Sequence, residues 1–176
     1  MGENKALLAF RGQPLLRRQI DLLAPLFEEI LIGASDSAPY ASFKIPVVPD
    51  LLSERCALTG IHALLKAAQR PRVFAVACDL PFLSPNLIEK LLETPGHPDA
   101  VVPESDRGLE PLHAVYSRSC LPAIEDAARR GVWKVSGFYP GLQVERPRIR
   151  DADWLVDGRS PFLNVNTPED WRSAAP

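Results

Sequence analysis

An aspartate, Asp79, follows the most continuously apolar run of the chain, residues 72–78. A run of this kind is expected of a parallel strand covered on both faces, so the carboxylate would lie at the rim of a buried sheet, where the ligands of open α/β sheets bind. Mg²⁺ binds one or two carboxylate oxygens together with substrate phosphates and water, and a single well-placed aspartate can anchor it. The alternative is that Asp79 only caps the turn or helix that follows.

Two asparagines near the end of the chain form a second candidate group. Within residues 162–170, Leu163 and Val165 alternate with Asn164 and Asn166, which would bury the two apolar residues and place the asparagines together on the other face. Two amides on one side can bind an ion or phosphates. Thr167 followed by Pro168 also predicts the start of a helix. Capping explains that start but not the paired asparagines.

A lysine near the beginning of the chain, Lys5, completes the set of polar groups that could handle phosphates. A lysine supplies a mobile positive charge, and in phosphate-binding loops it works beside backbone N–H groups that glycines leave unobstructed. The opening Met1-Gly2-Glu3-Asn4-Lys5 contains such a glycine. Taken alone, however, it is also an ordinary start of a helix.

Together, residues 1–8, 77–82 and 162–170 resemble the active site of the molybdenum cofactor guanylyltransferases, and the similarity extends over almost the whole chain. Enzymes of this group transfer a nucleotide from a nucleoside triphosphate to a phosphate-bearing acceptor. The resemblance implies that Lys5 and Asp79 are catalytic and bind the nucleotide. It also implies that Asp79, helped by Asn166, holds Mg²⁺, with Mn²⁺ as a possible substitute.

The family's first strand and most of its glycine-rich loop are absent from the sequence. Family members begin with a strand and a loop of the form Leu-Ala-Gly-Gly-x-Ser-x-Arg-Met-Gly-x-x-Lys, and Met1, Gly2 and Lys5 match only its last part. The true start can lie upstream, the loop can exist outside this numbering, or the chain can be a degenerate relative without catalysis. A sheet without its central strand would expose neighbouring edges, so we expect the strand and loop to precede Met1.

Further residues match the nucleotide site of the family. Asp50 matches a family aspartate that can accept guanine N–H groups or orient the ion, and the alternative is a solvated loop acid. Residues 56–60 stand where the family has Gly-Pro-Leu-Ala-Gly, and only Leu58 and Gly60 match. Gly33 stands where some relatives carry an asparagine. The resemblance thus implies nucleotide binding by Asp50, Leu58 and Gly60, with the choice of base open.

Residues 110–116 resemble the family segment that lies near the acceptor phosphate or pterin. The resemblance implies that Glu110 and His113, together with Asn164 and Asn166, bind the acceptor. A lone histidine within a strand is also typical of a packed core position. Both interpretations of His113 stay open.

The implied reaction transfers GMP from GTP to the terminal phosphate of molybdopterin, giving molybdopterin guanine dinucleotide and pyrophosphate. Because a phosphate dianion is already ionised near neutral pH, positioning and charge neutralisation would supply most of the rate enhancement. A cytidylyltransferase or sugar-phosphate nucleotidyltransferase is a related alternative. A catalytically silent relative that binds the cofactor or a molybdoenzyme is another. Molybdopterin-carrier proteins and apo-molybdoenzymes are further candidate partners.

Alternating apolar segments predict the elements that must position these residues. Helices are expected over residues 13–27, 59–68, 85–92, 121–130 and 132–138 and from residue 168, with Thr59 and Ser84 as caps, and strands over 29–33, 44–50, 72–78, 99–103 and 111–116. This alternation predicts an α/β fold. We expect a three-layer α/β/α sandwich with a mostly parallel, Rossmann-like sheet of the nucleotidyltransferase type.

Composition narrows the class of protein. The chain is 46% hydrophobic and 24% charged, as expected for a globular protein, so we predict one nucleotidyltransferase domain over residues 1–176. A net charge of −2 without a basic run argues against nucleic acid or an anionic membrane as a partner. The cysteines lack C-x-x-C spacing, and no signal peptide or membrane-length apolar run occurs. We therefore expect a cytoplasmic protein, most simply a monomer.

Overall fold

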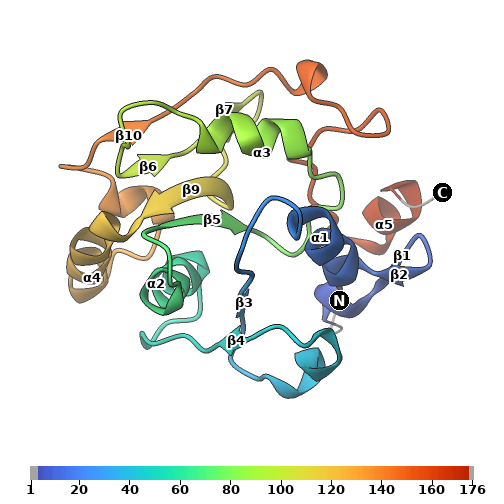
Figure 1. Cartoon of the computed structure of the whole chain (residues 1–176), viewed down its shortest axis with the longest axis horizontal. Helices are drawn as coiled ribbons and strands as arrows, with labels where there is room; N and C mark the ends of the chain where they lie inside the picture. The colour runs from blue at the N-terminus through green and yellow to red at the C-terminus, as the bar shows by residue number, and fades with distance from the viewer. Residues whose placement is uncertain (1–3, 175–176) are drawn as a thin grey trace.

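Helices and strands alternate through most of the chain in a computed structural model that describes residues 4–174 (Figure 1). Met1 and Gly2, which match the family's loop, lie outside the described residues. The α-helices are α1 (Leu15–Leu23), α2 (Ala57–Ala67), α3 (Pro85–Leu92), α4 (Leu121–Arg129) and α5 (Pro168–Ala174). Short 3-10 helices span Lys5–Leu7, Ala38–Phe43, Arg118–Cys120, Val135–Phe138 and Asp151–Asp153.

The strands are short and form one larger sheet and several two-stranded pairs. They are β1 (Ala9–Phe10), β2 (Gln13–Pro14), β3 (Ile32–Gly33), β4 (Val47–Val48), β5 (Arg72–Val76), β6 (Ala100–Val101), β7 (Glu104–Ser105), β8 (Gly108–Leu109), β9 (His113–Ser117) and β10 (Val144–Glu145). The larger sheet has the order β10-β6-β9-β5. A separate pair, β3-β4, is parallel, and β1-β2 and β7-β8 are antiparallel.

The larger sheet is mixed rather than mainly parallel. β10 and β6 run parallel, but β9 runs antiparallel to both β6 and β5. Residues 72–78 were expected to form a parallel strand covered on both faces. Among the described residues the strand is present, but its pairing is antiparallel. β5 pairs only with β9, in the opposite direction, and of its residues only Ala75 is buried. The apolar run predicted the strand, but it carried no information on the direction of the neighbour.

Helices cover both faces of the larger sheet, which confirms the layered α/β fold. On one face, residues of α2 and α4 pack with Ala114 and Tyr116 of β9. On the opposite face, α3 packs through Leu87 and Leu91 against Val115. Consecutive residues of β9 thus contact opposite layers, as the alternation of side chains along a strand requires. Figure 1 shows the sheet between these helices, with β3 and β4 beyond β5.

Capping residues account for two helix starts. The hydroxyl of Ser84 accepts the N–H of Leu87 at 3.4 Å, as predicted for the cap of α3. In α2 the predicted cap is displaced by three residues, because Cys56 occupies the cap position and Thr59 lies within the first turn. The Thr59 hydroxyl instead accepts the N–H of Cys56 at 3.3 Å. None of the helices within residues 4–174 is long and apolar enough to span a bilayer.

Candidate functional site

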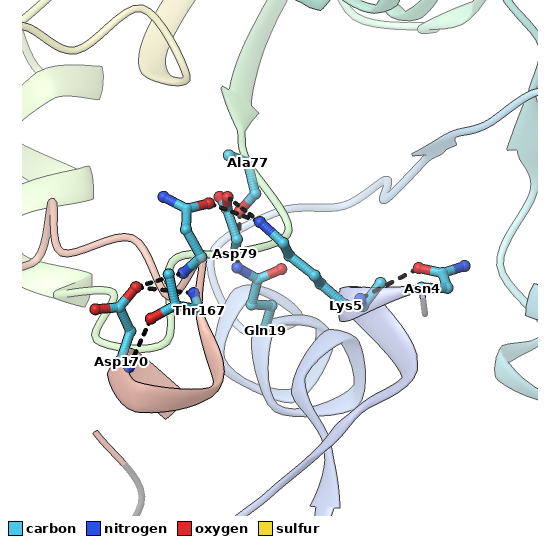
Figure 2. A network of polar contacts seen from close by, with 9 residues as sticks. Asn4, Lys5, Gln19, Ala77, Asp79, Thr167 and Asp170 are labelled. Atoms are coloured by element: carbon cyan, nitrogen blue, oxygen red, sulfur yellow. Dashed lines mark hydrogen bonds and ion pairs between the residues drawn. The ribbon is translucent and has the colours of Figure 1, made fainter. Parts of the chain in front are cut away.

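Lys5, Asp79 and Asn166 meet in space although they lie in the first, middle and last parts of the chain. The Lys5 ammonium donates to Asn166 Oδ1 at 2.6 Å across 161 residues of sequence. The same nitrogen lies 3.8 Å from Asp79 Oδ2. Figure 2 shows the Lys5 side chain reaching toward the Asp79 carboxylate. The three residue types expected to handle phosphates therefore form one polar cluster, here called the Asp79 cluster.

The Asp79 carboxylate is mostly buried and only partly partnered. Its side chain is 18% exposed, and within residues 4–174 no hydrogen-bond donor reaches the buried Oδ1 atom. A buried carboxylate oxygen without a partner is costly, and a cation would offset that cost. No group of three or more His, Cys, Asp or Glu residues that could hold a metal occurs in the described part of the chain. Asp79 therefore fits a cation that takes its remaining ligands from substrate and water.

The loop that carries Asp79 is held by a glutamine that the sequence reading did not identify. Gln19, on α1 and 5% exposed, donates from Nε2 to the carbonyls of Ala77 and Leu80, each at 2.9 Å (Figure 2). The backbone N–H of Val165 donates to the Asp79 carbonyl at 3.0 Å. The sequence contained one signal for this role, because Gln19 is a polar residue among the apolar positions of the predicted helix. These bonds fix the loop from two directions.

Asp170 orders the backbone beside Asn166. One carboxylate oxygen of Asp170 accepts the N–H groups of Thr167 at 2.8 Å and Asn166 at 3.0 Å. In return, the Thr167 hydroxyl accepts the N–H of Asp170 at 3.1 Å. The bond from the Thr167 backbone, followed by that from Asn166, lowers the pKa of Asp170. The predicted helix start at residue 168 is confirmed, and it also positions Asn166.

Lys5 is anchored by the short helix in which it lies. Asn4 accepts the N–H of Ala6 through Oδ1 at 3.2 Å and so caps the 3-10 helix Lys5–Leu7. Ala6 is buried against Ile20 and Ile32. The backbone of Lys5 is thus tied to the core, while its side chain, 27% exposed, stays free to reach the Asp79 cluster.

A cavity of about 850 Å³ lies beside the Asp79 cluster, with mostly apolar walls. Asp79, Asn164, Glu110 and Gly60 all line it. The structure therefore brings together four of the residues that the sequence proposed for substrate binding. Gly60 leaves open space where a side chain would begin, since no heavy atom lies within 4 Å of an added Cβ.

Glu110 lies at the cavity in a half-buried position. Its Oε1 accepts the Ser105 hydroxyl at 2.6 Å. Burial raises the pKa of Glu110, the bond from Ser105 opposes this rise, and the nearby charge of Asp151 adds to it. A carboxyl group of this kind can accept or share a proton with a bound polar group.

His113 lies in the core and not at the cavity surface. It is 0% exposed, and its ring packs edge-on against Phe74 and Phe162 with centroid distances of 5.1 and 5.0 Å. Within residues 4–174 neither ring nitrogen has a hydrogen-bond partner. Burial lowers the pKa of His113 to about 3, so the ring is neutral. Of the two interpretations left open for His113, this arrangement matches the packed core residue.

Leu58 and Asp50 are placed differently from the other nucleotide candidates. Leu58 is 0% exposed and packs in the core among residues of α2 and α4, so its side chain is not available to a nucleotide. Asp50 follows β4 and is half-buried. Among the described residues no hydrogen bond or ion pair joins it to the Asp79 cluster. Nucleotide binding by Asp50 stays a prediction.

Known proteins resemble this chain along most of its length. A family model described as MobA-like NTP transferase domain matches residues 1–143. A probable molybdenum cofactor guanylyltransferase of Pelotomaculum thermopropionicum is 37% identical over 170 residues, which cover 97% of this chain and 83% of that protein.

Solved structures share the fold. One of them is molybdopterin-guanine dinucleotide biosynthesis protein A of Archaeoglobus fulgidus, which superposes with a TM-score of 0.82 at 24% sequence identity. The superposition covers 99% of this chain and 90% of the Archaeoglobus chain. Another is Rv0371C of Mycobacterium tuberculosis, solved as a complex with manganese, with a TM-score of 0.70 at 19% sequence identity. The superposition covers 99% of this chain and 92% of the Rv0371C chain. The matched domain, the relative and the Asp79 cluster agree, and this chain belongs to the family of MobA-like NTP transferase domains.

Proposed function

We propose that this protein transfers GMP from GTP to the terminal phosphate of molybdopterin. An oxygen of that phosphate would bond to the α-phosphorus of GTP, while the bond from this phosphorus to the oxygen bridging to the β-phosphate breaks and pyrophosphate leaves. The observation that carries the proposal is the Asp79 cluster, in which Lys5 meets a carboxylate whose buried Oδ1 has no partner within residues 4–174. The Pelotomaculum relative, which is named a probable molybdenum cofactor guanylyltransferase, supports the choice of substrates.

Each residue of the cluster has a role in this reaction. Lys5 would place its positive charge on the triphosphate as negative charge moves onto the leaving pyrophosphate. Asn166 would hold the Lys5 ammonium in place through the bond of 2.6 Å. Asp79 Oδ1 is the atom that would hold Mg²⁺, or Mn²⁺ in its place, since it has no partner among the described residues. When bound, such an ion neutralises phosphate charge.

The acceptor would lie in the cavity beside the cluster. Glu110 and Asn164 line that cavity together with Asp79, and both are polar. An acceptor held there would present its phosphate toward Asp79 while its apolar parts contact the cavity walls. Asn166 as a second ion ligand is a weaker proposal, because its oxygen already accepts Lys5. Binding of carrier proteins or apo-molybdoenzymes, a monomeric state and a cytoplasmic location stay predictions.

The test is turnover with a panel of nucleotides. Purified protein is incubated with molybdopterin, Mg²⁺ and GTP, CTP, ATP or UTP in turn, and pyrophosphate and dinucleotide are measured. We expect both products with GTP, and neither with GTP when molybdopterin is omitted. Turnover with CTP instead would identify a cytidylyltransferase, which the departures at residues 56–60 and at Gly33 make the leading alternative. Cofactor binding without pyrophosphate release would identify a silent relative.

A further inference from the structure

The three segments that carry the residues of the Asp79 cluster share one small apolar core. Each segment contributes to it a buried residue that lies a few positions along the chain from the polar one. These residues are Phe10, Phe82 and Val165, and the set is here called the Phe10 core. The rings of Phe10 and Phe82 pack edge-on with a centroid distance of 5.8 Å. The Phe10 core therefore fixes the three segments relative to one another.

The last helix, α5, joins the Phe10 core through Trp171. The indole ring packs edge-on against Phe10 with a centroid distance of 5.6 Å, and its Nε1 donates to the Ala9 carbonyl at 3.0 Å. Ala174 is the second residue through which α5 enters this core. A helix of seven residues is not stable by itself, so α5 depends on these contacts. Figure 1 shows α5 next to β1 and β2.

The hairpin of β1 and β2 leaves the Ala9 carbonyl free for the bond from the indole. The N–H of Leu15 donates to the Leu8 carbonyl at 3.0 Å, and Ala9 stands opposite Pro14. Bonded and non-bonded positions alternate along an antiparallel pair, so the backbone groups of Ala9 point away from β2. Pro14 also has no N–H to donate. The indole of Trp171 thus provides a donor that β2 cannot provide.

The bond from Trp171 to Ala9 is linked through the chain to the bond from Lys5 to Asn166. On one side, the N–H of Trp171 donates to the carbonyl of Thr167 at 3.0 Å, and Thr167 follows Asn166 directly. On the other side, Ala9 follows shortly after the 3-10 helix that contains Lys5. The two bonds therefore close one ring of chain segments. Loss of the indole would release α5 and with it the position of Asn166.

We propose that Trp171 is a positioning residue, which docks α5 on the hairpin of β1 and β2 and so holds Asn166 against the Lys5 ammonium. Its effect on turnover rests on the proposed function, whereas its effect on the position of Asn166 does not. Within residues 4–174, Trp171 is not among the residues that line the cavity. It would therefore act through Asn166 and not on the substrate.

The first test compares wild type, Trp171→Ala and Trp171→Phe without any ligand. The phenylalanine variant keeps a ring against Phe10 but removes the indole N–H. It is the smaller change and gives the same test if the alanine variant does not fold. Arg172→Ala is the matched control, because Arg172 lies on the same helix, is exposed and pairs with Glu169.

The measurement is amide hydrogen exchange by NMR in the segment before α5. The N–H of Val165 donates to the Asp79 carbonyl, so its exchange reports on the contact between the two segments. We expect exchange at Val165 to be about tenfold faster in Trp171→Ala and about threefold faster in Trp171→Phe. The Arg172→Ala control should exchange as wild type does, and Ala114 of β9 should stay unchanged in all four proteins.

The second test is a double-mutant cycle on turnover with GTP and molybdopterin. Trp171→Ala should lower kcat about tenfold, as expected for Asn166→Ala, and change the KM for GTP less than about twofold. Added to Asn166→Ala, it should lower kcat by less than about twofold, because a residue that acts through Asn166 then has nothing left to position. A further tenfold loss in the double variant would overturn the proposal, since it would indicate an independent effect on the fold.

The two tests separate this proposal from the proposed function. If wild type releases no pyrophosphate with any nucleotide, the proposed function fails, and the exchange rates alone decide the positioning role. Equal exchange at Val165 in wild type and both Trp171 variants would overturn that role. Equal acceleration in Arg172→Ala would also overturn it, because any change on α5 would then have the same effect.

Discussion

The Asp79 cluster and the Glu110–His113 segment were both singled out by resemblance, yet the fold treats them in opposite ways. In the cluster, Lys5, Asp79 and Asn166 converge on one point. In the segment, Glu110 reaches the cavity while His113 is fully buried between aromatic rings. Asp79 and Glu110 both stand outside strands, whereas His113 lies within β9 and faces the α3 layer. In this fold a polar side chain reaches the site when its residue follows the end of a strand, as Asp79 and Glu110 do. The type of residue matters less than this position.

The largest effect is expected from removing the charge of Asp79. Asp79→Asn keeps the shape of the side chain but weakens the hold on a cation, so turnover with GTP should fall about a thousandfold. The Tm should hold or rise, because the change removes a mostly buried charge whose Oδ1 has no partner in the described structure. Initial rates of pyrophosphate release check this prediction. A variant with near-normal turnover in Mg²⁺ would remove Asp79 from the site.

A smaller loss is expected at the other two members of the cluster. Lys5→Met removes the ammonium that lies between Asp79 and Asn166, and turnover should fall about a hundredfold. Asn166→Ala removes only the acceptor of that ammonium, so we expect a loss of about tenfold. The ratio of the two effects separates a direct role of Lys5 from a positioning role of Asn166. Equal losses would mean that Asn166 contacts substrate or ion itself.

Glu110 should show its partly buried position in the pH dependence of stability. Burial raises its pKa above the ordinary value of 4.5, so the folded state binds the proton more tightly than the unfolded state. The protonated Glu110 therefore makes its whole contribution to the free energy of unfolding below pH 4.5. This contribution is lost as the pH rises through the pKa of the folded state. Urea unfolding of wild type and Glu110→Gln across this range should show the variant losing less stability. Parallel curves would contradict the burial effect.

The smallest effect on turnover is expected at His113. His113→Phe keeps an aromatic ring between Phe74 and Phe162 and removes two buried ring nitrogens without partners. Turnover and the KM for molybdopterin should stay within about twofold, and the Tm should hold or rise. A tenfold higher KM with an unchanged Tm would return His113 to the acceptor site and would erase the contrast with the Asp79 cluster.

Local patterns predicted much of the fold and part of the site. The spacing of apolar residues identified α1, α3 and α4, and the caps at Ser84 and Thr167 were read correctly because capping depends on neighbouring residues. Strand segments were recognised, but only two residues each of β3 and β4 form the ladder. Gln19 was missed, since its two carbonyl partners lie 58 and 61 residues away. No local pattern encodes such distances.

The sequence alone determined the alternation of apolar segments, the caps and the candidate residues Lys5, Asp79 and Asn166, because each depends on residue type and short spacing. Tertiary structure alone decided which candidates meet. It joined Lys5 to Asn166 across 161 residues and buried His113. It also set β9 antiparallel to β5 and left an apolar space between β5 and β3. Long-range pairing decides these features, since contacts between distant residues form only when the whole sheet and its helices pack.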